Sequence, residues 1–196
     1  MTDPHNDFRH IEYLRQGTLR QQEAYATLRA LGILEALASY DARLAGTLPI
    51  DVDIPGSDLD ILCQVEEARM DAFTAQLRRE YGRHPGFTLA RKQRYGHPIL
   101  LCDFYFRDFP IQVYGSPTPV DQQRAWVHLL AEAHLLAKTG PEAKEAVRAL
   151  KRAGMKTEPA FAQVFGLVGD PYEALYVLGQ QYRAQTNADE RGRISN

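Results

Sequence analysis

The sequence predicts an α+β fold in which a mixed β-sheet is flanked by helices, and two observations support this. Apolar residues recur at spacings of three and four near both ends of the chain, which is the pattern of amphipathic helices. Between residues 42 and 116, short apolar runs alternate with turn-forming residues, which is typical of strands. Helices, then a sheet, then further helices form one of the standard layered architectures.

Each expected element follows from its local pattern. Residues 8–40 carry apolar side chains at helical spacing, interrupted at Gly17 and Gly32, and predict two or three helices. Alternation between turn signals predicts strands over residues 43–45, 59–65, 87–93, 99–106 and 111–114. Helical patterns predict helices over residues 67–81, 121–138 and 141–153, with two more beginning at residues 157 and 171. The last three strands are joined by short links, which favour antiparallel neighbours.

The chain length and composition predict a single compact unit. The 196 residues are enough for one full-sized core, and 44% hydrophobic with 24% charged residues is close to globular averages. We divide residues 1–196 into N-terminal helices (8–40), a sheet core (41–116), a C-terminal helical region (117–184) and a flexible tail (185–196).

The charge and the apolar runs exclude several classes of protein. A net charge of −2 gives no general attraction to nucleic acid, so a role in coating DNA or RNA is not indicated. No apolar run is long enough for a membrane span, and the polar N-terminus lacks the apolar core of a secretory signal. Cys63 and Cys102 are too few for a disulfide scaffold and are expected to be small buried apolar residues. We therefore expect a cytoplasmic protein with no membrane partner.

One segment carries the residues for chemistry. Asp58 and Asp60 alternate with apolar residues, so on a strand both carboxylates share one face. Their backbone positions are roughly 7 Å apart, which lets the two side chains converge on one divalent cation. Hard oxygen ligands of this kind suit Mg²⁺ or Mn²⁺. The alternative interpretation is that both aspartates are solvated positions on an exposed strand.

A second pair precedes these carboxylates in the sequence. Gly46 and Thr47 follow a short apolar strand. Glycine lets a phosphate approach the backbone closely, and threonine offers a hydroxyl and an N–H. A phosphate-binding pair and a carboxylate pair are the two halves of a phosphoryl or nucleotidyl transfer site.

The segment resembles the signature of the nucleotidyltransferase superfamily that includes DNA polymerase beta. Gly46 and Thr47 match the Gly-Ser pair of that signature, and Ser57, Asp58 and Asp60 match its Ser-Asp-x-Asp part at a fitting spacing. The sequence departs from the pattern between the two parts, where Asp51 and Asp53 replace the basic residues often found there. Residues 46–62 and 150–175 together are similar to an uncharacterised bacterial domain family within or near this superfamily.

The resemblance implies a nucleotidyltransferase-like fold and a metal-dependent enzyme that transfers a nucleoside monophosphate from a nucleoside triphosphate to an unknown acceptor. Asp58 and Asp60 would hold Mg²⁺ or Mn²⁺, and Gly46, Thr47 and Ser57 would contact the nucleotide phosphates. The superfamily usually has a third carboxylate on a nearby strand, and Asp103 is our candidate to complete the metal site or activate the acceptor hydroxyl.

The strand pattern supports the placement of Asp103. Cys102 and Phe104 belong to the apolar face of residues 99–106, so Asp103 turns to the other face, where Gln112 is also expected. Gln112 could contact substrate but cannot replace a charged metal ligand well.

Two alternatives to this enzyme remain open. The absence of basic residues around Gly46 favours a non-catalytic nucleotide- or phosphate-binding module on the same fold. Alarmone synthesis is a third option, because residues 111–114 are similar to one short strand of those synthetases.

Two further groups of polar residues have an ordinary structural explanation. Arg91, Lys92 and Arg94 could guide a polyanion, but charge that protects an exposed strand edge is the favoured interpretation. His128 and Glu132 are four residues apart on an expected helix and are interpreted as a surface pair.

Overall fold

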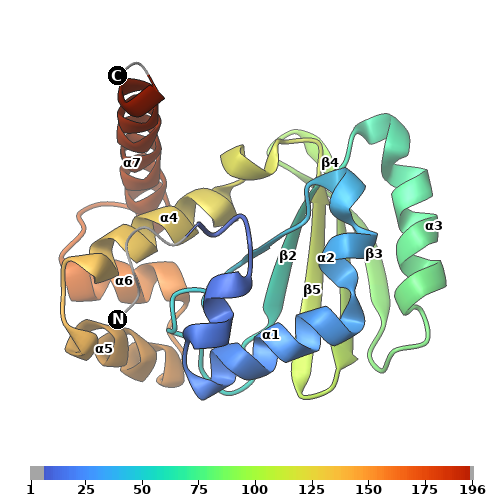
Figure 1. Ribbon diagram of the computed structural model, residues 1–196, viewed down its shortest axis with the longest axis horizontal. Coiled ribbons are helices and arrows are strands. Elements are labelled where there is room, and N and C mark those ends of the chain that lie inside the picture. The colour runs from blue at the N-terminus through green and yellow to red at the C-terminus, as the bar shows by residue number, and fades with distance from the viewer. Residues whose placement is uncertain (1–6, 195–196) are drawn as a thin grey trace. The chain divides into compact units, whose positions relative to one another are not determined.

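A computed structural model describes the backbone of residues 7–194 and the side chains of residues 7–184 (Figure 1). The chain divides into two compact units. Residues 7–49 and 55–123 form the first, which we call the sheet unit, and residues 50–54 join the chain from Arg124 onward in the second, the helical unit. The single compact unit expected from the sequence stays a prediction.

The sheet unit holds a five-stranded mixed sheet in the order β1-β2-β5-β4-β3. Its strands are β1 (Arg43–Ala45), β2 (Leu59–Gln64), β3 (Thr88–Arg94), β4 (His97–Phe106) and β5 (Phe109–Ser116). β2 and β5 are parallel, whereas β1 with β2, β5 with β4 and β4 with β3 are antiparallel. All five expected strands are present, and the predicted α+β class with a mixed sheet is confirmed.

Most helices of the sheet unit pack on one face of the sheet (Figure 1). They are η1 (Glu12–Gln16), α1 (Leu19–Leu31), α2 (Ile33–Ala36), η2 (Ala38–Tyr40) and α3 (Met70–Tyr81), whereas the short helices η3 (Glu67–Arg69) and η4 (Val120–Gln122) supply no residue to the core on that face. Their apolar side chains, such as Leu28 and Phe73, form one core with Ile61, Phe104 and Val113 of the strands. The opposite face of the sheet is therefore the one available for polar chemistry.

Alternation along β4 confirms the predicted direction of Asp103. Leu100, Cys102 and Phe104 are buried in the core. Asp103 and Tyr105, which alternate with them along the strand, are more exposed. Cys63 and Cys102 are both buried, as expected. Burial raises the pKa of the Cys102 thiol to about 12, and a nearby Asp103 carboxylate adds to this rise. Burial likewise raises the pKa of Cys63, which disfavours the thiolate form of both cysteines.

The helical unit contains α4 (Arg124–Ala137), α5 (Pro141–Arg152), α6 (Thr157–Phe165) and α7 (Pro171–Ile194). α4 and α7 approach closely, because a Cβ added at Gly179 would lie 2.3 Å from the Val127 carbonyl oxygen. α7 continues as helical backbone through Ile194, into the segment expected as a flexible tail, and the flexibility of that tail stays a prediction. None of the described helices is long and apolar enough to cross a membrane.

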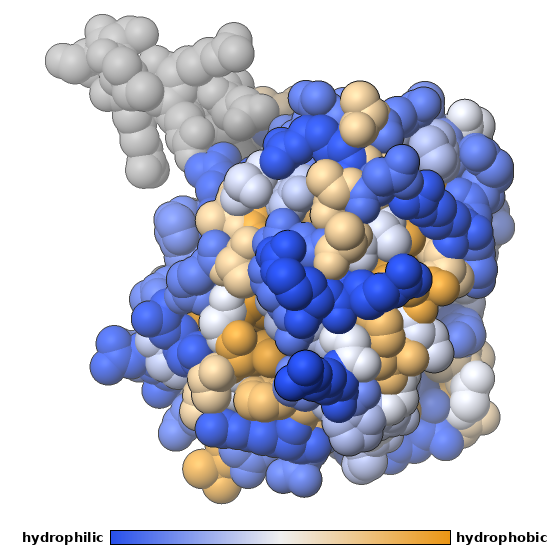
Figure 2. Space-filling model, turned by 90° about the vertical axis from the view of Figure 1, so that its right-hand side faces the viewer, coloured by the Kyte–Doolittle hydropathy of each residue, from blue (hydrophilic) through white to orange (hydrophobic). Residues whose placement is uncertain are grey.

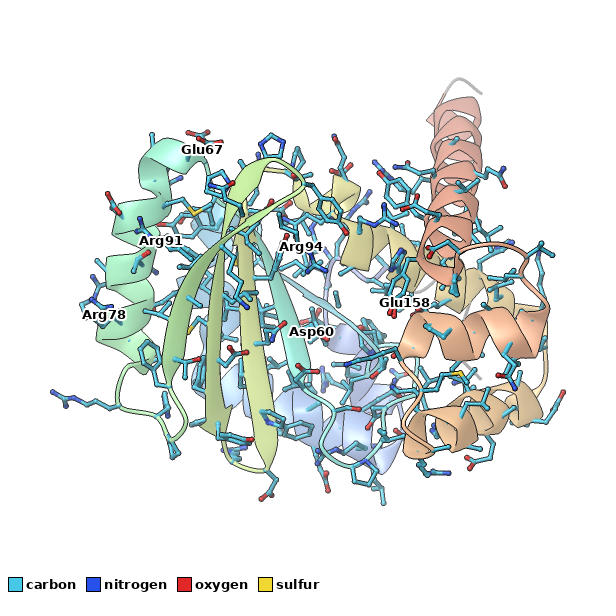
Figure 3. All side chains as sticks on the ribbon, turned by 180° about the vertical axis from the view of Figure 1, so that it is seen from behind. Asp60, Glu67, Arg78, Arg91, Arg94 and Glu158 are labelled. Atoms are coloured by element: carbon cyan, nitrogen blue, oxygen red, sulfur yellow. The ribbon has the colours of Figure 1, made fainter. Side chains whose placement is uncertain are left out.

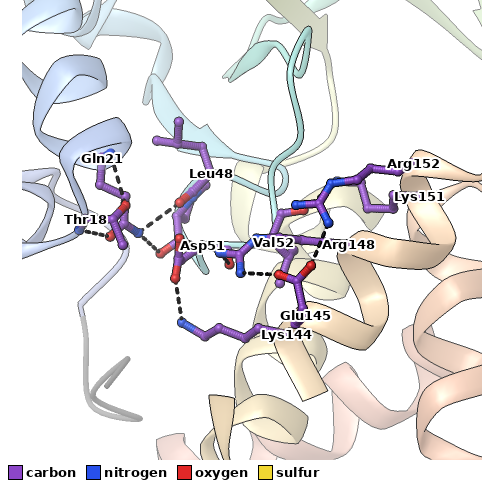
Figure 4. A network of polar contacts seen from close by, with 11 residues as sticks. Thr18, Gln21, Leu48, Asp51, Val52, Lys144, Glu145, Arg148, Lys151 and Arg152 are labelled. Carbon is purple, nitrogen blue, oxygen red and sulfur yellow. Dashed lines mark hydrogen bonds and ion pairs between the residues drawn. The ribbon is translucent and has the colours of Figure 1, made fainter. Parts of the chain in front are cut away.

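Residues 50–54 are tied to α5 by charged side chains (Figure 4). The Asp51 carboxylate lies 3.3 Å from Lys144 Nζ and 2.7 Å from an Arg148 guanidinium nitrogen. Lys151 Nζ donates to the Val52 carbonyl at 2.8 Å. Asp51, which stands where the signature often has a basic residue, is thus an ion-pair partner of α5.

The prediction that His128 and Glu132 form a surface pair is wrong. Their exposed fractions are 6% and 4%. His128 Nδ1 is 3.2 Å from the Glu158 carboxylate, and its Nε2 is 3.0 Å from the Tyr172 carbonyl oxygen. The partners come from α6 and α7, which pack against α4 and cover the polar side of that helix.

Candidate functional site

A close approach of two residues joins the two sequence motifs of the site. β1 ends at Ala45, which pairs in register with Asp60 of β2, and Gly46 follows directly. Gly46 has a φ of +77°, and a Cβ added there would lie 2.1 Å from Asp60 Oδ2. No other residue than glycine fits this position without displacing the carboxylate. The structure therefore places the glycine of the first motif against the second aspartate of the signature.

The residues that follow Gly46 are fixed by a buried side chain of α1. Gln21 Nε2 donates to the carbonyl oxygens of Leu48 at 3.0 Å and Pro49 at 3.2 Å (Figure 4). Gln21 also completes a capping box with Thr18 at the start of α1, which fixes its own backbone. Thr18 followed three residues later by Gln21 is the pattern of such a cap, whereas no local pattern indicates the two contacts that hold the loop after β1.

Thr47, Ser57 and Asp58 lie in the loops around β1 and β2 and are partly buried. β2 begins at Leu59, so Asp58 stands one residue before the strand. Strand alternation therefore fixes the direction of Asp60 only, on the face opposite to buried Leu59 and Ile61.

A row of polar side chains crosses the open face of the sheet from Asp60. Asp60 pairs with Gln112 of β5, which pairs with Asp103 of β4, which pairs with Thr88 of β3. Gln112 Nε2 donates to Asp103 Oδ1 at 2.8 Å, and Thr88 Oγ1 donates to Asp103 Oδ2 at 3.3 Å. Both oxygens of Asp103 are thus engaged, and the residue beside Asp60 is an amide.

The separation of the carboxylates bears on the metal site. Asp60 and Asp103 are two strands apart, which corresponds to about 10 Å between their backbones. Within residues 7–184, no group of three or more His, Cys, Asp or Glu side chains is arranged to hold a metal ion. The role of Asp103 as third ligand stays a prediction, as do the ligand roles of Asp58 and Asp60.

Asp58 and Asp60 still suit a magnesium ion when substrate supplies further ligands. Mg²⁺ in nucleotide-processing proteins is commonly bound by one or two carboxylates together with phosphate oxygens and water. Two aspartates at positions i and i+2, next to a glycine that permits close approach of a phosphate, are a donor set of that kind. Asp58 and Asp60 are therefore a donor set that suits a divalent cation whose remaining ligands come from a phosphate and water.

The comparison with protein families shows to which family the chain belongs. The model of the family described as "Domain of unknown function (DUF4269)" matches residues 26–178. The chain belongs to the DUF4269 family. The match includes both signature motifs, Asp103 and Gln112, together with α4, α5 and α6. No curated protein is detectably similar in sequence to this DUF4269 member.

Solved structures with a similar fold include Cid1 and the polymerase core of TRAMP. Cid1, described as having RNA terminal uridylyl transferase activity, superposes with a TM-score of 0.51 at 15% identity, covering 83% of this chain and 53% of Cid1. A Cid1 structure with Mg 3'-dATP bound gives 0.51 at 17% identity, with 82% and 54% covered. The polymerase core of TRAMP, an RNA surveillance complex, gives 0.50 at 13% identity, with 91% and 66% covered.

These similarities confirm the nucleotidyltransferase fold that the signature predicts. The chain spans only about half to two thirds of the length of these polymerases. At such low sequence identity, the shared property is the fold.

Proposed function

We propose that this DUF4269 member is a metal-dependent nucleotidyltransferase that transfers a nucleoside monophosphate from a nucleoside triphosphate to an acceptor. The contact between Gly46 and Asp60 carries the proposal, because it joins a phosphate-approach point to a metal-binding carboxylate. The similarity in fold to nucleotidyltransferases supports the same reaction class.

Each candidate site residue has a separate role in this proposed reaction. Gly46, Thr47 and Ser57 bind the triphosphate, and Asp58 and Asp60 hold Mg²⁺ or Mn²⁺ against it. The ion, when bound, neutralises the charge that develops on the phosphates. An acceptor hydroxyl loses its proton, its oxygen forms a bond to the α-phosphorus, and the bond to the departing pyrophosphate breaks. Asp103, on the same face of the sheet, is the candidate base for that proton.

Calorimetry with each of the four nucleoside triphosphates, with and without Mg²⁺, tests the first half of the proposal. We expect binding that needs Mg²⁺ and that is lost in the Asp58→Asn/Asp60→Asn variant. Asp108→Asn is the matched control, because Asp108 is exposed in the turn between β4 and β5. Transfer of α-labelled nucleotide to an acceptor tests the second half, and full turnover by the double variant would overturn it.

The position of Gln112 favours a second candidate function. The side chain in register with Asp60 on the neighbouring strand is neutral, where a third carboxylate would strengthen a metal site. A non-catalytic nucleotide- or phosphate-binding module on the same fold accommodates that amide. Metal-independent binding of a nucleotide without turnover would support this module over the enzyme.

A further inference from the structure

The three basic residues of β3 are divided between the two faces of the sheet. Arg91 turns to the face covered by α3, where a guanidinium nitrogen lies 2.5 Å from the Asp71 carboxylate and 2.9 Å from Thr74 Oγ1. Lys92 and Arg94 alternate with it. Lys92 pairs in register with Ile99, and Arg94 with His97, on the face that carries Asp103.

Lys92 and Arg94 differ from Arg91 in their partners. Both are exposed, and no ion pair among the side chains of residues 7–184 includes either of them. Figure 2 shows the side of the sheet unit that carries α3 and β3, where hydrophilic residues are gathered over much of the surface. The one cation on the covered face is thus engaged with α3, and the two on the open face are available to an anion.

Two tyrosine side chains lie near Arg94. Its guanidinium lies 5.6 Å from the centre of the Tyr95 ring, and Tyr95 is 66% exposed. Tyr95 and Gly96 both have positive φ and form the tight turn between β3 and β4, which fixes the direction of Arg94. Burial raises the pKa of Tyr114, and the positive charge of Arg94 opposes that rise, which puts Arg94 within electrostatic range of the Tyr114 hydroxyl.

Arg94 and Asp60 lie over the same face of the sheet, while Arg78 and Arg91 lie toward α3 (Figure 3). Between β2 and β3 there are three strand spacings, which is roughly 14 Å. A triphosphate held at Gly46 and Asp60 therefore lies on the same face of the sheet as Lys92 but toward the opposite edge. Two cations placed there suit a second phosphate group beside the triphosphate.

We propose that Lys92 and Arg94 form the acceptor side of the site and bind a phosphate group of the acceptor. This proposal deepens the proposed function and rests on it, because the protein has an acceptor only if it catalyses the transfer reaction. The tyrosines beside Arg94 suit an acceptor that also carries a nucleobase, because aromatic rings and guanidinium groups stack on bases. The phosphate belongs either to an oligonucleotide or to a small phosphorylated nucleoside.

Fluorescence anisotropy with a labelled single-stranded hexaadenylate RNA tests the site on the full chain. We expect Lys92→Gln/Arg94→Gln to weaken binding by about tenfold or more, because each lost contact is a charged hydrogen bond. RNA binding by this variant should also depend less on salt, with the slope of log affinity against log salt concentration smaller by about one to two. The matched control is Arg78→Gln/Arg83→Gln, which removes the same charge from exposed arginines on and after α3 and should bind as the unchanged protein does.

Competition by adenosine monophosphate distinguishes the two sources of phosphate. Full displacement of the RNA at millimolar nucleotide supports a small phosphorylated acceptor, and no displacement supports an oligonucleotide. Equal binding by the unchanged protein and the Lys92→Gln/Arg94→Gln variant, or equal weakening in the control, overturns the site. That result would assign both cations to protection of the β3 edge.

The same variants separate this inference from the proposed function. If nucleotide transfer occurs and Lys92→Gln/Arg94→Gln leaves its KM for acceptor unchanged, the acceptor site is wrong and the function stands. If no acceptor is modified but the variant still loses RNA binding, the nucleotidyltransferase assignment is wrong and the anion site stands.

Discussion

Gly46 and Asp60 are in contact so close that the glycine has no room for a side chain. A Cβ at Gly46 would lie 2.1 Å from Asp60 Oδ2 and 3.1 Å from its Cγ, and the backbone there has a φ of +77°. Gly46, directly after β1, and Asp60, on β2, are fourteen positions apart in the sequence and thus define one point of the site. The sequence signature contains both, and their contact explains why the first must be glycine.

Gly46→Ala should lose both stability and nucleotide binding. A positive φ costs an L-residue about 1–2 kcal/mol, and the methyl group must also push the Asp60 carboxylate away. We expect unfolding by denaturant to show a loss of about 2 kcal/mol or more, and calorimetry to show loss of Mg²⁺-nucleotide binding.

Gly32→Ala is the matched control for this change. Gly32 also has a positive φ, +67°, but a Cβ there would meet nothing within 4 Å. It should lose about 1 kcal/mol from backbone strain alone and bind nucleotide normally. Equal behaviour of the two variants in the binding assay would contradict a role for the Gly46–Asp60 contact.

Local patterns were sufficient for the strands and for the face of Asp103, because alternation is a property of each strand by itself. They were not sufficient for the neighbours of Asp60. β5 lies between β2 and β4 and runs parallel to β2, a pairing with no local signal in the sequence. For that reason Gln112, and not Asp103, stands next to Asp60.

Gln112→Glu should make the sheet unit dependent on divalent metal. The new carboxylate lies in register between Asp60 and Asp103, and it no longer donates a hydrogen bond to Asp103. Repulsion among the three acids should cost about 1–2 kcal/mol in the absence of metal. Added Mg²⁺ or Mn²⁺ should restore the melting temperature, because binding to the folded state stabilises it.

Gln112→Met separates charge from the lost hydrogen bond. It removes the amide without adding a carboxylate, so its melting temperature should not respond to metal more than that of the unchanged protein. A Gln112→Glu variant that is equally indifferent to metal would show that Asp60 and its neighbours do not converge on a cation.

Asp51→Asn should destabilise the helical unit. Asp51, Lys144 and Arg148 have side-chain exposures of only 17%, 15% and 19%, so the ion contacts are largely shielded from water. Asn tolerates the φ of +59° at this position, which isolates the effect of the charge. We expect a loss of about 1–3 kcal/mol in chemical unfolding, since Lys144 loses its carboxylate partner and Arg148 loses one of two.

Glu145→Gln tests whether that loss depends on burial. Glu145 also pairs with Arg148 and with Arg152, but its side chain is 58% exposed. Little change in stability is expected from it. If both variants lose the same amount, the network around Asp51 is no stronger than an ordinary surface ion pair.

His128, Glu132 and Glu158 show why the helical unit was the harder part to predict. A polar pair four residues apart on an amphipathic helix looks like a solvent-facing pair. The residues that cover it lie at least 26 positions further along the chain, on α6 and α7, so no local pattern indicates the burial. A buried histidine and two buried or half-buried acids are therefore visible only in the folded structure.

Glu132→Gln should stabilise the helical unit at pH 8. Burial raises the pKa of Glu132 well above its ordinary value, the negative charge of Glu158 adds to the rise, and Lys151 opposes it. The folded state therefore binds a proton that the unfolded state releases, so this carboxyl group lowers stability progressively as the pH rises above its unfolded pKa. Glutamine removes that penalty, and the melting temperature should rise by about 2–4 °C for each kcal/mol gained.

Glu158→Gln should give the opposite pH profile. Burial raises the pKa of Glu158, but the hydrogen bond from His128 and the neighbouring positive charges outweigh it, and the pKa is lowered overall. This carboxylate contributes stability above its unfolded pKa, and the contribution is lost as the pH falls through its folded pKa. Unfolding at several pH values between about 4 and 8 should show the Glu132→Gln gain growing with pH and a Glu158→Gln loss also growing with pH. If the stability gained by Glu132→Gln does not depend on pH, then packing of the new side chain, and not removal of the buried charge, is the cause of the gain.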